Sequence, residues 1–318
     1  GGGPNGMGRP DDNGNGTGGE PPAMPTADDT DTTDSTSTSA KALKAGSEVN
    51  ISGGEFKIDS ADDSVHSNGN IVITGGNISV ASGDNGMHAN GNLTISDGTV
   101  DITKSYEGIE GSIVTIDGGT ISVVASDDGI NCAGGSDTGS TDRMGADQFS
   151  SQDGVELNIN GGTVTIDADG DGLDSNGNFT MAGGTVYVCG PTNGGNGALD
   201  YNGTATVTGG TLIACGAVGM EEGFSDNSTQ YSVLHDLGST VSANEKLTIT
   251  DSDGKEILSF TPTKTWQSVV FTSADLTEGE TYTIKAGSQS ETVTIDGIVT
   301  SNSKGMSFGR GHGGGRGF

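Results

Sequence analysis

Side chains that can bind cations recur along the middle of this 318-residue sequence at intervals of about 22 residues. Their positions form three columns: His66, His88, Glu110, Asn131, Asp174, Asp200 and Glu222; then Asp63, Asn85, Glu107, Asp128 and Asp171; then Asp62, Asp84, Tyr106 and Asp127. Such a period predicts that equivalent side chains stack one strand spacing, ~4.8 Å, apart. Two carboxylates at that separation repel by roughly 3.5 kcal/mol at an effective dielectric constant near 20. The columns therefore call for a counterion.

Calcium suits these columns because it accepts about six to eight oxygen ligands with tolerant geometry. The expected ligands are Asp62, Asp63, Asp84, Glu107, Glu110, Asp127, Asp128, Asn131, Asp171, Asp174, Asp200 and Glu222. Zinc prefers His or Cys in tetrahedral sets, and only His66 and His88 indicate it. The alternative is a solvated acidic edge without a bound ion. A single pair of acids would favour that alternative, whereas a column that persists over six coils favours calcium.

A glycine repeat sets the spacing of the columns. Each marker glycine precedes a short run of alternating apolar residues: Gly54, Gly76, Gly98, Gly119, Gly162, Gly184 and Gly210. Their separations are 22, 22, 21, 43, 22 and 26 residues, and the 43 is one period plus an insertion of 21 residues. Self-similarity at such a period predicts a solenoid.

Each repeat contains a GG pair, a strand, an acidic turn, one apolar residue, an Asn-Gly turn and a further strand. The segment GGNISVASGDNGMHANGNLTIS at 75–96 matches GGTVTIDADGDGLDSNGNFTMA at 161–182 almost position for position. Apolar residues such as Ile78 and Val80 alternate with polar ones, which directs one side of each strand inward. We therefore predict an all-β fold, a single-stranded parallel β-helix with coils of about 22 residues, over residues 47–240.

Residues 241–300 break the period and predict a small C-terminal β cap domain. LTITDSDGKEILSF, 247–260, is typical of a hairpin centred on Asp253-Gly254. Further strands are expected near residues 268–272, 281–286 and 291–295. A cap would cover the open edge of the last coil, which otherwise invites aggregation. We expect Trp266 to anchor this cap to the last coil, with stacking on a ligand as the alternative.

The two ends of the chain predict disordered tails. Residues 1–46 are dominated by Gly, Pro, Thr, Ser and Asp, and residues 301–318 are also rich in Gly. Such segments bury too little apolar surface to offset the entropy of ordering them. Hydrophilic tails are compatible with a secreted or cell-surface protein. The sequence starts at Gly1 rather than Met, and we expect that a leader has been removed.

Composition excludes several classes of partner. The chain has 13 Lys and Arg against 43 Asp and Glu, a net charge of −30, which argues against nucleic acid and anionic membranes. It contains no apolar run long enough to span a membrane. Its three cysteines form no disulfide framework. Cys189 and Cys215 occupy equivalent positions and are expected to be buried thiols, because a disulfide between adjacent parallel strands has poor geometry.

Four motifs together resemble a known family. The resemblance covers residues 47–240 and is carried by SYEGIEG at 105–111, SDDGINCAGG at 126–135, DGLDSNG at 171–177 and GNGALDYNG at 195–203. The family is the secreted carbohydrate-binding β-helix family of anaerobic plant-degrading bacteria, which is similar in fold to family 9 pectate lyases. It is associated with calcium and with binding of polygalacturonic acid and, to some extent, cellulose.

The resemblance implies a non-catalytic, calcium-bound module for anionic plant cell-wall polysaccharide such as pectin. Its acidic motifs fall on Glu107, Glu110, Asp127, Asp128, Asn131, Asp171, Asp174 and Asp200, whereas His66 and His88 depart from them. The residues expected to contact the sugar are Lys104, Tyr106, Arg143 and Tyr201. Arg143 belongs to the insertion at 134–153, which either covers the binding face or is a plain surface loop. We expect a monomer.

Two other functions stay open. A polysaccharide lyase would need calcium to neutralise the uronate and a base, for which Lys104 is the candidate. A salt bridge between Lys104 and the acidic edge is the simpler interpretation, and no arginine-rich cluster accompanies it. The chain could instead be a structural surface solenoid with calcium holding its coils together. The insertion and the irregular coil after Gly184 weigh against an inert rod.

Overall fold

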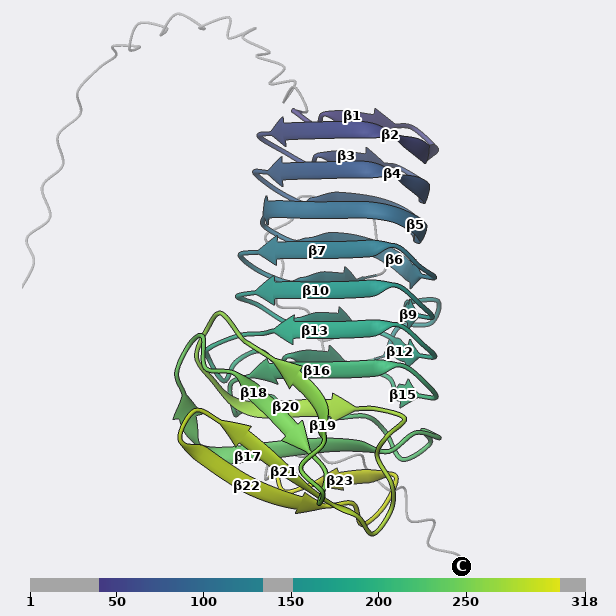
Figure 1. Cartoon of the computed structure of the whole chain (residues 1–318). Coiled ribbons are helices and arrows are strands. Elements are labelled where there is room, and N and C mark those ends of the chain that lie inside the picture. The colour runs from purple at the N-terminus through teal and green to yellow at the C-terminus, as the bar shows by residue number, and fades with distance from the viewer. Residues whose placement is uncertain (1–39, 134–150, 304–318) are drawn as a thin grey trace, which may run out of the picture. The chain divides into compact units, whose positions relative to one another are not determined.

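The computed structural model describes residues 40–133 and 151–303 (Figure 1). All regular elements among these residues are β-strands. Of the predicted tails at 1–46 and 301–318, residues 1–39 and 304–318 lie outside the described residues, as do most of the insertion and Arg143. The inner ends of both tails were predicted wrongly: Leu43–Ala45 forms a strand that pairs with the next coil, and Ser301 ends the strand Val299–Ser301. None of the described residues belongs to a helix that could cross a membrane.

Parallel strands stack coil on coil to form the solenoid. The longest row pairs seven strands in parallel: β2 (Glu48–Ser60), β4 (Asn70–Ser82), β5 (Met87–Ser105), β7 (Thr120–Ala125), β10 (Thr163–Ala168), β13 (Thr185–Cys189) and β16 (Thr211–Gly216). A second row of short segments contains β1 (Leu43–Ala45), β3 (Val65–Ser67), the start of β5, the start of β6 (Ile109–Ile116), β8 (Ile130–Cys132), β11 (Leu173–Ser175) and β14 (Leu199–Tyr201). The third row ends with β9 (Glu156–Ile159), β12 (Asn178–Met181) and β15 (Ala205–Val207). The predicted parallel β-helix is confirmed.

Apolar columns fill the interior because the sequence period equals one coil. One column pairs in register from coil to coil, with every side chain at most 1% exposed: Val65, Met87, Ile109, Ile130, Leu173 and Leu199. In β4, Ile78 and Val80 point inward and are 1% exposed, as their alternation predicts. Each coil therefore buries the same positions as the next one.

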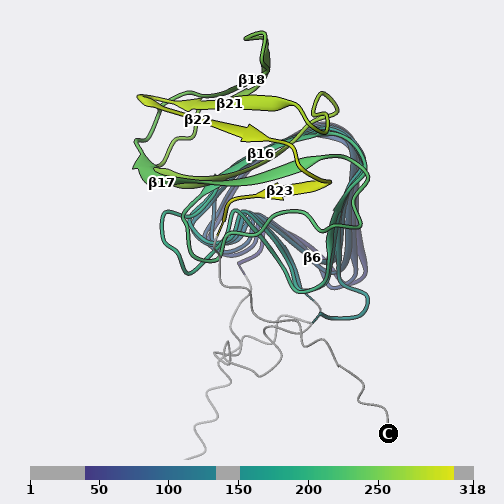
Figure 2. The same cartoon turned by 90° about the horizontal axis from the view of Figure 1, so that it is seen from below.

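A separate antiparallel sheet follows the solenoid. Its strands are β19 (Glu256–Phe260), β18 (Leu247–Thr250), β21 (Thr281–Ala286) and β22 (Gln289–Thr294), in that order, so the hairpin at Asp253-Gly254 is confirmed. Three more strands connect the two parts: β17 (Ser232–Val241), β20 (Trp266–Thr272) and β23 (Val299–Ser301). β20 runs antiparallel to both β16 and β17, and thereby covers the edge of the last coil. Figure 2 shows the four-stranded sheet lying across β16 and β17.

A second apolar cluster joins this sheet to the last coil. Trp266 is 2% exposed and belongs to the same cluster as Ile213 and Cys215 of β16. This confirms its predicted anchoring role, and its burial excludes stacking on a ligand. Cys189 and Cys215 face each other across β13 and β16 as buried free thiols, as expected.

The marker glycines turn the chain between rows, and all seven have positive φ. Gly162 has a φ of 78°, and a Cβ built there would lie 2.8 Å from the backbone of Gly118 in the preceding coil. Gly254, in the exposed β18–β19 hairpin, has a φ of 79°, but a Cβ there would meet no atom within 4 Å. Both positions would strain the backbone of any other residue, but only at Gly162 would a side chain also collide with the neighbouring coil.

Gly162→Ala should therefore cost more stability than Gly254→Ala. Strain alone predicts a loss of about 1–2 kcal/mol for Gly254→Ala. Gly162→Ala adds a clash that pushes two coils apart, so we expect about 3 kcal/mol or more. Chemical denaturation of the two variants measures the difference. Equal losses of stability in the two variants would contradict this, because they would mean that moving the coils apart at Gly162 costs no free energy.

Candidate functional site

The second row of short strands aligns polar side chains on the outside of the solenoid. Asn131 of β8 pairs with Asp174 of β11, which pairs with Asp200 of β14. The turns that precede these strands carry Asp128 and Asp171, and the Asp171 N–H donates to Asp128 Oδ1 at 2.7 Å. Because the strands are in register, these side chains come from different coils yet lie next to one another.

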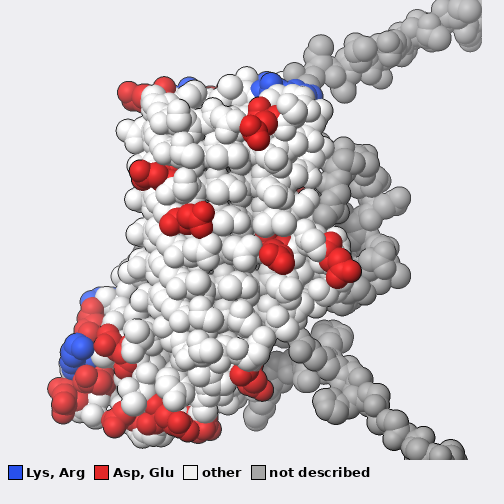
Figure 3. All heavy atoms as spheres, turned by 90° about the vertical axis from the view of Figure 1, so that its right-hand side faces the viewer, with Lys and Arg blue, Asp and Glu red and all other residues white. Residues whose placement is uncertain are grey.

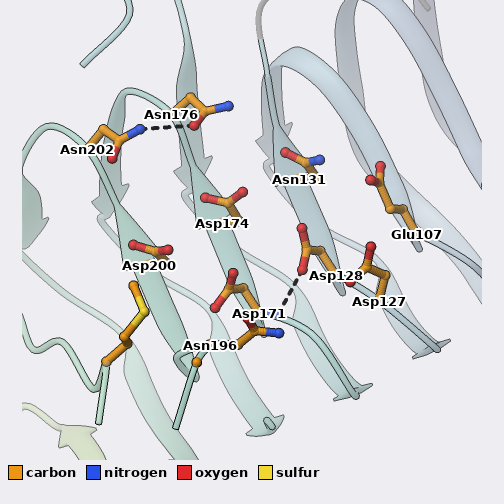
Figure 4. A pocket seen from close by; sticks show the side chains of 12 residues that line it. Glu107, Asp127, Asp128, Asn131, Asp171, Asp174, Asn176, Asn196, Asp200 and Asn202 are labelled. Atoms are coloured by element: carbon orange, nitrogen blue, oxygen red, sulfur yellow. Dashed lines mark hydrogen bonds between the residues drawn. The ribbon is translucent and has the colours of Figure 1, made fainter. Parts of the chain in front are cut away.

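These side chains line a cavity of about 430 Å³ (Figure 4). Its lining consists of Glu107, Asp127, Asp128, Asn131, Asp171, Asp174, Asn176, Gly195, Asn196, Asp200, Asn202 and Met220. Six of these residues are carboxylic acids and four are asparagines, and the described part of the lining contains no Lys or Arg. Figure 3 shows the side of the molecule that carries β6, β9, β12 and β15, where acidic side chains lie singly on the solenoid and gather at the lower left, in the C-terminal part. Among the described residues, this side of the solenoid shows no group of acids like that of the cavity.

Burial and mutual repulsion raise the proton affinity of the acids in the cavity. Burial, together with neighbouring carboxylates, raises the pKa of Glu107 to about 8. Burial and the charges of Asp128 and Asp200 raise the pKa of Asp171 to about 8 as well. Burial and the same neighbours raise the pKa of Asp174 well above its ordinary value. Without a cation, several of these acids are protonated at neutral pH.

The donor set fits a calcium ion. Oxygens of Asp128, Asp171 and Asp174 lie within 4.8 Å of one another. Calcium binds oxygens at about 2.3–2.6 Å, so opposite ligands of one ion are separated by up to about 5 Å. Asn131 Oδ1 is buried and has no hydrogen-bond partner among the described residues, which suits a neutral ligand. These four residues could therefore hold one ion.

Seven of the proposed cation ligands line the cavity, and five do not. The seven are Glu107, Asp127, Asp128, Asn131, Asp171, Asp174 and Asp200. Asp62, Asp63 and Asp84 form a separate group near the first coils, with their carboxylate oxygens within 4.8 Å of one another. Glu110 accepts a hydrogen bond from Asn85 and lies 3.5 Å from His88 Nδ1. Glu222 accepts a hydrogen bond from the Tyr201 N–H at 3.3 Å.

Three of the four residues expected to contact sugar, Lys104, Tyr106 and Tyr201, lie outside the described lining. Lys104 is exposed near the end of β5, and Tyr106 follows in the next turn. The Tyr201 hydroxyl donates to the Gly223 carbonyl at 2.6 Å, and its ring packs against the core. Arg143 lies outside the described residues. The lining thus differs from the set that the sequence suggested for sugar contacts.

Sequence reasoning identified Asn131 but missed the other three asparagines of the cavity. Asn176 and Asn202 begin Asn-Gly turns, which were interpreted only as turn formers. The same period stacks them, and Asn202 Nδ2 donates to Asn176 Oδ1 at 2.9 Å (Figure 4). Asn196 also lines the cavity. It lies in the coil between Gly184 and Gly210, which is longer than the repeat period, so the period does not predict where this residue is placed.

Fold and cavity together define a β-solenoid with a polar recess on its side. Residues 13–86 and 87–197 match the family model described as carbohydrate-binding domain-containing protein. The two matches cover more than half of the chain, so it belongs to this family. No curated protein and no solved structure matches the chain significantly. Membership indicates carbohydrate binding as the general function, and the second match contains most of the cavity lining.

The cation-free protein should lose stability as the pH rises from about 4 to about 8. In the folded state the pKa of Asp171 is about 8, against an ordinary value of 3.8. Between these values the folded chain keeps a proton that the unfolded chain has released, so each rise in pH favours unfolding. Thermal denaturation after chelation should show a midpoint that falls by several degrees across this interval and levels off above it.

Asp171→Asn should flatten that pH dependence, because it removes one of the acids with a raised pKa. Asp253→Asn, in the exposed hairpin loop of the C-terminal sheet, is the matched control and should leave the slope unchanged. A midpoint that rises with pH in the chelated wild-type protein would contradict this account of the cavity.

Proposed function

We propose that this protein is a non-catalytic module that binds polygalacturonate or pectin, and to some extent cellulose, with calcium held in the acidic cavity. The observation that carries the proposal is the gathering of six carboxylic acids around one cavity, in a chain of a carbohydrate-binding family. A solenoid without a bound cation would not explain why the acids are brought together from several coils, because their repulsion destabilises the stack.

Calcium reconciles an acidic cavity with an acidic ligand. Asp128, Asp171 and Asp174 would hold the ion, with Asn131 Oδ1 as a neutral ligand. Bound calcium supplies the positive charge that a uronate carboxylate needs, and its tolerant coordination leaves positions for sugar oxygens. The protein's own share is to fix these donors on stacked strands. Binding of the polysaccharide therefore requires that the acids have lost their protons.

The asparagines of the cavity are suited to sugar hydroxyl groups. Each amide offers both donors and an acceptor, as does a hydroxyl-rich ligand. Asn176, Asn196 and Asn202 lie beside the acids in the lining. Asn176 lies on one coil and Asn196 and Asn202 on the next, an arrangement that suits an extended chain running along the solenoid. We place the protein outside the cell, secreted or at the cell surface, and acting as a monomer.

A lyase is the second candidate and is less consistent with the site. β-Elimination needs a base beside the uronate that calcium neutralises. Lys104 is absent from the cavity lining, and the described lining offers no other Lys or Arg. A structural solenoid is the third candidate, and it predicts no affinity for polysaccharide.

Titration of polygalacturonate into the purified chain tests the proposal. We expect binding in calcium that is abolished by chelation, without the ultraviolet absorbance of unsaturated products. Asp174→Asn should weaken calcium-dependent binding by about tenfold or more, since it removes a cation ligand. Asp253→Asn, a charge change far along the chain and outside the lining, should bind as the wild type does. Binding that is indifferent to chelation would overturn the role of calcium, and absence of binding would leave the structural solenoid.

Lys104→Ala separates a binding module from a lyase. Because Lys104 lies outside the lining, we expect unchanged affinity for polygalacturonate and no absorbance from either protein. Absorbance that grows with the wild type and disappears in Lys104→Ala would establish a lyase instead. The measurement follows absorbance over time at saturating calcium.

A further inference from the structure

A second group of possible cation ligands lies at the first coils, away from the acidic cavity. His66 of β3 and His88 of β5 occupy equivalent positions and pair in register. Asp63 precedes His66 in the turn that leads into β3. All three are nearly inaccessible, with 1% of Asp63 and 3% of each histidine exposed. Two imidazoles and a carboxylate buried together are a donor set that differs in chemistry from the oxygen ligands of the cavity.

The ligand atoms of Asp63, His66 and His88 all lie within 4.8 Å of one another. Asp63 Oδ2 lies 2.8 Å from His66 Nδ1 and 3.7 Å from His88 Nδ1. Glu110 Oε2 lies 3.5 Å from His88 Nδ1 and is held there by the Asn85 amide. In a tetrahedral zinc site with bonds of about 2.0–2.1 Å, neighbouring donors are separated by about 3.3 Å. The separations of Asp63 Oδ2 from the two histidine nitrogens lie on both sides of that value, so small side-chain shifts would bring these three donors to it. Glu110 lies near His88 but outside this group of three.

The outer nitrogen of His66 is held as metal-binding histidines usually are. Its Nε2 lies 3.0 Å from Asn68 Oδ1, an acceptor for the Nε2–H. On the other side of the ring Nδ1–H donates to Asp63 Oδ2 at 2.8 Å, and a bound metal ion would take the place of that proton. The rings of His66 and His88 meet edge to face with centroids 4.9 Å apart, which limits their rotation. The nitrogens are therefore directed before any ion arrives.

Lys41 stands close to the position that a cation would take. Its ammonium group hydrogen-bonds to Asp63 Oδ2 and to Asp62 Oδ1, the latter at 3.2 Å. A divalent ion bound to Asp63 would repel this ammonium, which could keep its contact with Asp62. Lys41 and a metal ion thus compete for one carboxylate oxygen.

We propose that Asp63, His66 and His88 bind a zinc-class divalent cation. Two imidazole nitrogens and a carboxylate, with water as a fourth ligand, suit zinc or cobalt, whereas calcium prefers six or more oxygens. The site joins two neighbouring coils, because Asp63 and His66 come from one repeat and His88 from the next. It is separate from the calcium proposal, since none of its three protein donors lines the cavity.

Titration of the full chain, prepared without a histidine tag, with zinc and with cobalt tests the site. We expect one equivalent to bind in the presence of saturating calcium, and the cobalt complex to show the intense visible bands of four-coordinate cobalt. His66→Gln and His88→Gln should each weaken binding by about 100-fold or more, because each removes a direct ligand. His235→Gln is the matched control: His235 is equally buried but pairs with Glu291 in the C-terminal part.

Lys41→Gln gives a test in the opposite direction. Removal of the competing ammonium should tighten zinc binding about tenfold, equivalent to roughly 1.4 kcal/mol. This variant and the wild-type cobalt spectrum decide the matter even if the histidine variants fail to fold. Asp174→Asn should leave zinc binding unchanged, which keeps this site distinct from the cavity. Zinc binding that survives both histidine substitutions, or a wild type that takes up no zinc, would overturn the proposal.

Discussion

In-register stacking of parallel coils is the constraint on which the rest of this molecule depends. Each position in one coil lies one strand spacing from its equivalent in the next. For Val65, Met87 and Ile109 this repetition is favourable, because like side chains pack on like and exclude water. For carboxylates the same repetition concentrates charge. The geometry that builds the core thus also builds the acidic cavity.

The charge of the acidic side chains is compensated differently at the first coils and in the middle coils. At the first coils Lys41 and two histidines surround Asp63, and although burial favours the neutral acid, their hydrogen bonds hold the pKa of Asp63 well below its usual range. In the middle coils no described basic side chain lines the cavity, and the pKa of Asp171 and Glu107 is raised instead. One end carries its own positive groups, while the middle needs protons or a cation from solution. The two regions therefore balance the charge of their acids by different chemistry.

The C-terminal part ends the repetition by changing the direction of pairing. β20 runs antiparallel to β16, so the last coil does not present a free parallel edge to a second chain. Lys264 extends this contact along the solenoid through an ion pair with Asp167 at 2.8 Å. A second apolar cluster also packs the C-terminal part against the last coil. A rigid support of this kind holds ligands from different coils in a fixed arrangement.

The sequence by itself determined the solenoid, its period, the apolar columns and the C-terminal hairpin, because each depends on local alternation and on spacing along the chain. It also grouped seven acids and amides that the structure brings to one cavity, since equal phase means adjacency in a stack. Only the tertiary structure decided that Glu110 faces His88 rather than the cavity, and that Lys41 contacts Asp63. Those choices depend on side-chain rotamers and on contacts across coils. The entry of Asn196 into the lining likewise depends on a segment that breaks the period, whose path no repeat can specify.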